Sequence, residues 1–301
     1  MLSTEATAAT VAPPPTLPRT RPLYWSIRRE IWENRSVYLA PLAVAGLVLF
    51  ALLAGMLTLP GKLAGAVDAA QQYSFAIRPF RTAPAPVMAA SFIVGMFYAL
   101  DALYGERRDR SILFWKSLPV SDRTTVLAKA IIPVLVLPLI AFALSMALLV
   151  ILLFPVTAIL LGTDASPTRL WLEVLLEQPP IMLYGLAAHA LWFTPIYAWL
   201  LLVSVWARRA PFLWAVSPIV LAVVERVAFQ TTYVSTFLKW RVIGGMAEAF
   251  IPGPAAKGNV TLLVELDPLG FLGSPGLWIG FAAAVVFVAA TVRLRRYRDP
   301  I

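Results

Sequence analysis

The hydrophobic pattern of this chain consists of long apolar runs separated by short clusters of charge. An α-helix needs about 20 apolar residues to cross the hydrocarbon core of a bilayer. Windows of that kind occupy residues 37–59, 86–104, 130–153, 181–206, 211–229 and 276–292. The third run continues through Phe154 and Pro155 to about Leu161, which predicts a longer helix with a kink. We therefore expect an all-α integral membrane protein with about six transmembrane helices.

The segment before the first window is amphipathic and too polar to cross a bilayer. On a helical wheel its apolar residues fill a little over half of the circumference, and Ser26, Arg29, Glu30 and Glu33 share the rest. We expect residues 21–36 to form an interfacial elbow helix on the cytoplasmic surface, with Trp and Tyr at headgroup depth. The alternative is a simple continuation of the first span.

Two further segments are expected to lie outside the spans. Residues 1–20 are small, polar and Pro-rich, which predicts a disordered cytosolic tail. Residues 230–275 form a large predicted outer loop, whose semi-apolar pieces 240–250 and 260–266 are too short to span. We expect these pieces to cap the outer mouth as short or partly re-entrant helices.

Composition supports a bilayer as the solvent. Apolar residues make up 60% of the chain and charged residues only 14%, whereas soluble domains average about 45–50% and about 25%. The net charge of +9 could indicate nucleic acid, but no soluble domain with a basic face is visible in the pattern. We therefore expect membrane lipid as a partner and no nucleic acid.

The distribution of Lys and Arg predicts the orientation. These residues concentrate before the first window, between the second and third, after the fourth and at the C-terminal end. By the positive-inside rule, those four segments are cytoplasmic. We expect a multi-pass protein of the bacterial inner membrane with both termini in the cytoplasm.

Several chemistries lack their usual residues. The chain has no cysteine and a single histidine, His189, so we expect no metal site. No G-x-x-x-x-G-K-[ST] phosphate loop occurs, since Gly61 and Lys62 are followed by Leu63. The chain is therefore not expected to be an enzyme, to have catalytic residues or to hold a cofactor.

The loop between the second and third windows, residues 105–129, is the most informative segment. Its charged start is followed by an apolar patch, Ile112 to Trp115, that lies outside any span. Such a patch needs a cover, either the membrane surface or another protein. Pro119 should end the middle segment, and Ser121 is a good N-cap for a helix that leads into the third span. The pattern predicts a compact helix, a break and a second helix.

The run ERRDRSILFWKSLPVSDRTTVLAKA, from Glu106 to Ala130, resembles the permease subunits of type-2 ATP-binding-cassette (ABC-2 type) exporters. An amphipathic helix ahead of six spans and a large last outer loop resemble the same family over nearly the whole chain. The resemblance implies that loop 105–129 holds a coupling helix, which docks in a groove of a separate cytosolic ATPase subunit. The implied contact residues are Glu106, Arg107, Arg110, Ser111, Phe114, Trp115, Lys116, Leu118 and Pro119.

The resemblance also implies the rest of the assembly. Two permease copies, identical or paralogous, would form the translocation pathway at their interface, and ATP and Mg would be bound by the partner ATPase. The alternative is that Phe114 and Trp115 are interfacial anchors and that the loop charges only set topology.

Ionisable residues inside the windows are functional suspects because burying charge in hydrocarbon is costly. Asp101 lies near the cytoplasmic end of the second window, and Glu225 and Arg226 lie near the outer end of the fifth. Either a pathway or a structural role is open to them. For His189 in the fourth window, we expect a neutral hydrogen bond to another helix rather than a proton relay.

Two other function classes compete with the exporter permease. An ion-coupled secondary transporter would show paired intramembrane carboxylates and inverted repeats, and the sequence pattern shows neither. A membrane protein that does not transport, such as a lipid-modifying enzyme, would need clustered His, Asp or Glu at one interface.

Overall fold

The computed structural model describes residues 20–117, 119–250 and 266–297. Within these ranges the chain is helical, and its one strand-like feature is an isolated bridge between Phe250 and Leu266. The predicted tail lies outside the described residues except for Thr20, as do residues 251–265 of the predicted outer loop. The expected all-α architecture is confirmed for the described part of the chain.

Five helical stretches are long and apolar enough to cross a membrane. Two are the single helices α2 (Ser36–Met56) and α16 (Pro275–Tyr297), and three are built of shorter helices that follow one another in line. Those three are α4 (Ala69–Thr82), α5 (Pro84–Asp101) and α6 (Tyr104–Arg108); α8 (Asp122–Ile131), η1 (Ile132–Val136) and α9 (Leu137–Leu160); and α10 (Pro167–Leu172), η2 (Glu173–Glu177) and α11 (Gln178–Trp206). By length and composition, the chain is a multi-pass membrane protein.

The third stretch changes its hydrogen-bonding pattern at a proline. Pro133 lies in the π-helical turn η1, where its missing N–H would otherwise leave an i−4 carbonyl unpaired. Beyond this turn, α9 continues through Pro155 to Leu160, so the extension expected from the sequence is present.

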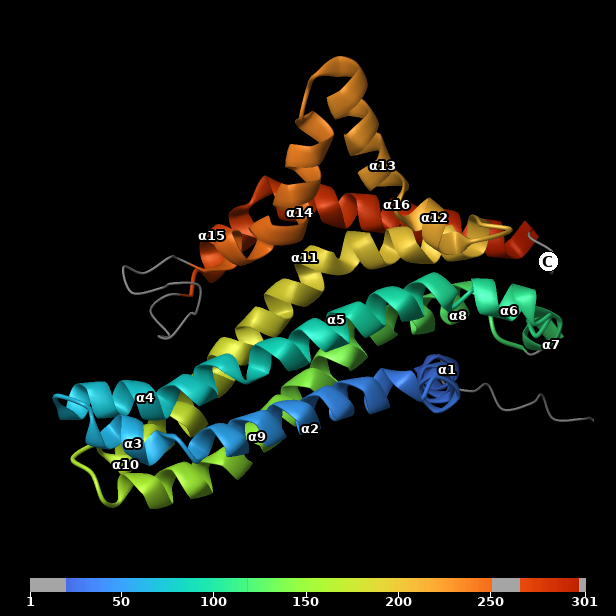
Figure 1. Cartoon of the computed structure of the whole chain (residues 1–301). Helices are drawn as coiled ribbons and strands as arrows, with labels where there is room; N and C mark the ends of the chain where they lie inside the picture. Colours follow the sequence, from blue (N-terminus) through green and yellow to red (C-terminus); the bar gives the residue numbers. More distant parts are fainter. Residues whose placement is uncertain (1–19, 118, 251–265, 298–301) are drawn as a thin grey trace, which may run out of the picture.

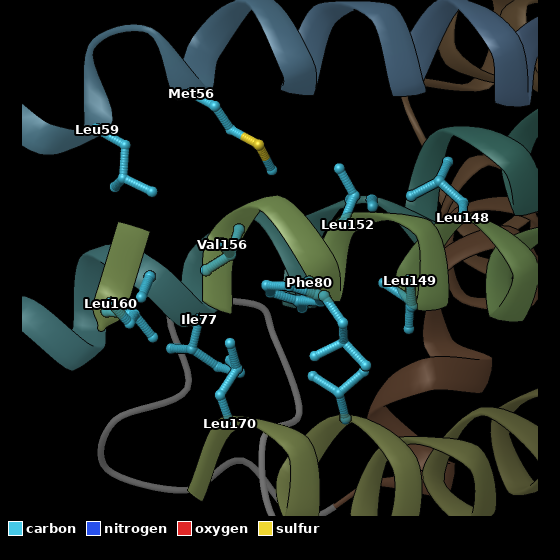
Figure 2. Close-up of a cluster of buried hydrophobic side chains, with 14 of the residues drawn as sticks. Met56, Leu59, Ile77, Phe80, Leu148, Leu149, Leu152, Val156, Leu160 and Leu170 are labelled. Carbon is cyan, nitrogen blue, oxygen red and sulfur yellow. The ribbon is translucent and has the colours of Figure 1, made fainter. Parts of the chain in front are cut away.

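A large hydrophobic core holds the end of the bundle farthest from α1 and the C-terminus (Figure 2). Leu59 of α3 (Leu59–Ala64), Phe80 of α4 and Leu152 of α9 are buried in it. Large apolar side chains also face outward, and Leu47 and Phe50 of α2 are 68% and 73% exposed. Apolar residues on both the inner and the outer faces match a hydrocarbon solvent.

The last two long helices, α11 and α16, lie side by side and run in the same direction (Figure 1). Trp192 in the first half of α11 packs with Leu277 at the start of α16, and Leu201 near the end of α11 packs with Val292 near the end of α16. Because the two helices are parallel, the chain between them must return to the opposite end of the bundle. The segment between residues 206 and 275 makes this return.

The structure corrects the prediction of a continuous fifth span over residues 211–229. This segment is broken into α12 (Pro211–Ala215), α13 (Ser217–Val224) and the π-helical turn η3 (Glu225–Phe229). Prolines occupy the first turns of α12 and α13, where a missing N–H is tolerated but a continuous helix is not. The segment is therefore not among the five long helices.

The predicted outer loop also begins differently from the expectation, with the helix α14 (Tyr233–Ala249). Helices α13 and α14 form a hairpin that projects from the bundle (Figure 1). Gln230 at its tip adopts a left-handed conformation with φ of 56°. Helices α12 to α14 lie between α11 and α16, and none of them is among the five long apolar stretches.

Close approach of backbones fixes α14 against its neighbours. A Cβ atom at Gly245 would lie 2.5 Å from the Trp192 ring of α11, and one at Gly280 of α16 would collide with the Arg241 guanidinium. Trp192 donates from Nε1 to the Arg241 carbonyl at 2.7 Å. Glycine is favoured at Gly245 because a side chain there would collide with the buried Trp192 ring.

The segment predicted to be an elbow helix is helical, as α1 (Thr20–Glu33). In Figure 1, α1 is seen end-on whereas α2 runs across the view, so α1 lies crosswise to the bundle. Its place among lipid headgroups stays a prediction.

Candidate functional site

The predicted helix, break and second helix are present between α5 and α8. Helix α6 is followed by a tight turn in which Arg110 has φ of 58°, and then by α7 (Ile112–Ser117). Ser121 caps α8 as expected, since its Oγ accepts from the Thr124 N–H at 3.2 Å. Ser204 of α11 holds the start of this element, because its Oγ accepts from the N–H groups of Leu103 and Tyr104, both at 2.9 Å.

A buried ion pair joins α1 to α8. Glu30 of α1 is 1% exposed and Lys129 of α8 is 3% exposed. The Lys129 ammonium lies 2.9 Å from Oε1 and 3.0 Å from Oε2 of Glu30. The Tyr98 hydroxyl of α5 donates to Glu30 Oε2 at 2.8 Å, and Arg29 Nη2 donates to Oε1 at 2.6 Å. Every carboxylate oxygen of Glu30 thus has a partner.

A second carboxylate extends the cluster to α6 and α16. Glu106 of α6 is buried, with Oε1 3.1 Å from the Lys129 ammonium and Oε2 2.5 Å from Nη1 of Arg295. Nε of Arg295 donates to Asp122 Oδ1 at 3.1 Å, at the start of α8. We call Arg29, Glu30, Glu106, Asp122, Lys129 and Arg295 the ion network.

The ion network is balanced, with three carboxylates and three cations. Removing such groups from water is expensive, and their mutual attraction repays the cost only when all partners are in place. Burial opposes ionisation of Glu30, but the charges and hydrogen bonds of Lys129, Arg29 and Tyr98 outweigh it and lower the pKa of Glu30 below its ordinary value of 4.5. The ion network therefore favours one arrangement of α1, α6, α8 and α16.

Helix α7 has one anchored face and one exposed face. Ile112 is buried, and the Trp115 ring lies 3.9 Å from the guanidinium carbon of Arg29 in a cation–π contact. On the other side, Leu113 and Phe114 are 61% and 60% exposed. Helix α7 is therefore anchored through Ile112 and Trp115 and presents Leu113 and Phe114 outward.

The structure describes eight of the nine implied contact residues, which are exposed, half-buried or buried. Arg110, Phe114, Lys116 and Pro119 are exposed, and Ser111 and Trp115 are half-buried. Leu118 lies outside the described residues.

The two buried candidates, Glu106 and Arg107, are corrected from surface contacts to internal supports. Glu106 belongs to the ion network, whereas the Arg107 guanidinium donates to the carbonyls of Val205 at 2.7 Å and Ala207 at 3.1 Å. Both side chains are turned inward because buried partners hold them there.

The intramembrane candidates have separate surroundings. Asp101 is exposed, with Arg108 Nη1 at 3.9 Å. Glu225 is buried at the hairpin and accepts from the N–H groups of Tyr233 and Val234, both at 2.7 Å, whereas Arg226 is exposed. Glu225 thus caps the start of α14.

The hydrogen-bond partner of His189 lies on its own helix, α11. We expected a hydrogen bond to another helix. Nε2 of His189 lies 3.4 Å from the Tyr197 hydroxyl, two turns further along α11. The rings of Phe92 and Phe193 pack against the imidazole with centroids at 5.5 and 4.5 Å. The surroundings of His189 are mainly aromatic.

Sequence reasoning missed most of the ion network. Lys129 and Arg295 were assigned only to the orienting excess of basic residues, and Glu30 to the polar face of α1. One available signal was the position of Lys129, directly before an apolar window, where a charge facing inward needs a partner. The identity of that partner depends on how α1 crosses the bundle.

Comparison with protein-family models, with curated proteins and with solved structures finds no match for this chain.

Replacing Lys129 with methionine should leave Glu30 and Glu106 buried without their shared cation. Breaking a buried pair in this way costs about 3–5 kcal/mol, so we expect the free energy of unfolding to fall by that order in detergent. Arg123→Met, at an exposed position of the same helix, should change it little. The double variant Glu30→Gln/Lys129→Met should lose less than Lys129→Met alone. Equal losses in the single and double variants would contradict the pairing.

The lowered pKa of Glu30 predicts a pH dependence of stability. Its contribution is present above pH 4.5 and is lost as the pH falls through the lowered pKa of the folded state. The difference in unfolding temperature between the wild type and Glu30→Gln should therefore shrink below pH 4.5. Burial raises the pKa of the nearby Glu33, so the wild type should instead gain relative to Glu33→Gln as the pH falls. The same trend in both comparisons would show that Glu30 does not ionise as described.

Proposed function

We propose that this chain is the membrane-spanning permease subunit of an ATP-driven exporter of the ABC-2 type, and that α7 is the element gripped by a separate cytosolic ATPase subunit. The observation that supports this proposal is the exposed pair Leu113 and Phe114 on the rigidly anchored helix α7. An apolar pair of this kind at a bundle end fits a protein partner with an apolar groove. The resemblance of residues 106–130 to the coupling segment of such permeases supports the same assignment.

The contacts behind α7 supply the mechanical part of the proposal. Displacement of α7 would reach α1 through the contact between Trp115 and Arg29. It would reach α8 and α16 through Glu106, which is ion-paired to Lys129 and Arg295. Helices α8 and α16 belong to long apolar stretches, so force applied at the turn before α7 would not be absorbed in a flexible loop.

The rest of the assembly follows from this proposal. The end of the bundle that carries α1, α6, α7 and the end of α16 is called the basic end here, because the Lys and Arg residues of these elements gather there. It would face the cytoplasm of a bacterial cell, where positive loops are retained. Two copies of the chain, or one copy and a paralogue, would enclose the translocation pathway. ATP and Mg would be bound by the ATPase, and its closure would move α7.

The proposal predicts that Leu113→Ala/Phe114→Ala separates the permease from its motor. The tagged full chain, purified from its native membranes, should carry a bound ATPase and hydrolyse ATP. The double variant should insert normally but lose most of the co-purified ATP hydrolysis, because interface anchors of this size each contribute about 1–2 kcal/mol or more.

A matched control removes the same two side-chain types elsewhere. Leu47→Ala/Phe50→Ala on the outer face of α2 should retain the bound ATPase, since these residues are exposed along a candidate membrane span. Full ATP hydrolysis in the Leu113→Ala/Phe114→Ala preparation would reject α7 as the docking element.

A further inference from the structure

A cavity of about 610 Å³ opens at the basic end of the bundle, between the end of α11 and α12. Its walls are formed by Trp206, Ala207, Arg208, Arg209 and Trp214. The ion network and the exposed face of α7 contribute none of these residues, so the cavity is distinct from the proposed coupling element. Its size falls within the range of about 300–1,000 Å³ that is typical of ligand pockets.

Two arginines give the cavity its charge. Arg208 and Arg209 are exposed, and across the described ranges neither has a carboxylate within ion-pair distance. The planar donor pattern of an arginine guanidinium matches the oxygens of a phosphate group, which it can bind in a bidentate manner. The side chains of the cavity are therefore suited to hold an anion.

Unpaired carbonyl groups at the C-terminal end of a helix would repel an anion, but at the end of α11 two of these groups are paired. The C-terminal carbonyls of a helix carry partial negative charge. Here Arg107 donates to the carbonyls of Val205 and Ala207, directly behind the cavity. Those carbonyls are satisfied from inside the bundle, so Arg208 and Arg209 are not needed to neutralise them.

The remaining walls are amphipathic and apolar. The rings of Trp206 and Trp214 meet edge to face with centroids 4.6 Å apart. Tryptophan favours the boundary between headgroups and acyl chains. Next to Trp214, Phe212 and Leu213 of α12 are exposed and provide an apolar surface beside the charged one. A soluble anion would use only the arginines, whereas a phospholipid would use both surfaces.

We infer that this cavity binds an anionic phospholipid, with the headgroup phosphate on Arg208 and Arg209 and the glycerol and upper acyl region against Trp206 and Trp214. Basic pockets between membrane helices are a known way of holding such headgroups. The lipid would lie where α12 leaves α11 and would hold the start of α12 at the membrane surface. This inference depends on the membrane-spanning architecture and not on the proposed exporter function.

Titration of the purified full chain with phosphatidylglycerol, phosphatidylcholine or inorganic phosphate, followed by native mass spectrometry, tests the inference. The wild type should bind phosphatidylglycerol at least about tenfold more tightly than phosphatidylcholine, because charge-assisted hydrogen bonds to the phosphate are complemented by the net negative headgroup. Arg208→Gln/Arg209→Gln should lose that preference.

The matched control is Arg293→Gln/Arg296→Gln, which removes the same charge from exposed positions at the same end of the bundle. This control should keep the preference if the cavity, rather than the general positive charge, selects the lipid. An unchanged preference in Arg208→Gln/Arg209→Gln, or an equal loss in both double variants, would overturn the inference. In the wild type, displacement of phosphatidylglycerol by inorganic phosphate at comparable concentration would also overturn it, since the ligand would then be a soluble anion.

Discussion

The ion network at the basic end of the bundle is the constraint on which the rest of the structure depends. Three carboxylates and three cations from α1, α6, α8 and α16 meet there, and four of them, Glu30, Glu106, Lys129 and Arg295, are buried. A hydrophobic contact tolerates sliding, but a buried charge that loses its partner incurs a penalty of several kcal/mol. The crossing of α1 over the bundle and the position of α6 are therefore fixed together.

This constraint explains how a short surface helix can act mechanically. Helix α7 has only six residues and would be marginal on its own. It is held because α6 before it is tied to Lys129 and Arg295 through Glu106, and because Trp115 stacks on Arg29. Leu113 and Phe114 are thereby presented on a rigid support, which is what a coupling element needs.

Helices α12 to α14, between α11 and α16, are not held by the ion network. Helices α12 and α13 are short, begin with prolines and lead to a hairpin tip capped by Glu225. The hairpin is fixed at its far end, where Trp192 meets Gly245 and Arg241 meets Gly280. The cavity beside Trp206 and Trp214 lies where α12 leaves α11, and the proposed lipid would bind there.

Much of the fold could be predicted from the sequence because each of the five long helical stretches contains an apolar run long enough to cross a bilayer, and hydropathy reports that length directly. The fifth window is also an apolar run, but it is broken where α13 begins with Pro218 in its first turn, and apolarity alone does not report a break. The site was predictable where neighbouring residues in the sequence determine the structure. Examples are the Ser121 cap of α8 and the apolar patch around Phe114, which lies outside the predicted spans. The site was not predictable where the signal is long-range, since Glu30 and Lys129 are 99 positions apart and meet only through the packing of α1.

The central claim, that α7 docks on a nucleotide-hydrolysing partner, is tested most directly by a photo-reactive amino acid in place of Phe114 in the full chain, activated in native membranes. The account predicts a covalent adduct between this position and an ATPase subunit, formed far more efficiently than from the same label at Phe50. Labelling of lipid alone from position 114 would contradict the account and leave α7 as a membrane-surface anchor.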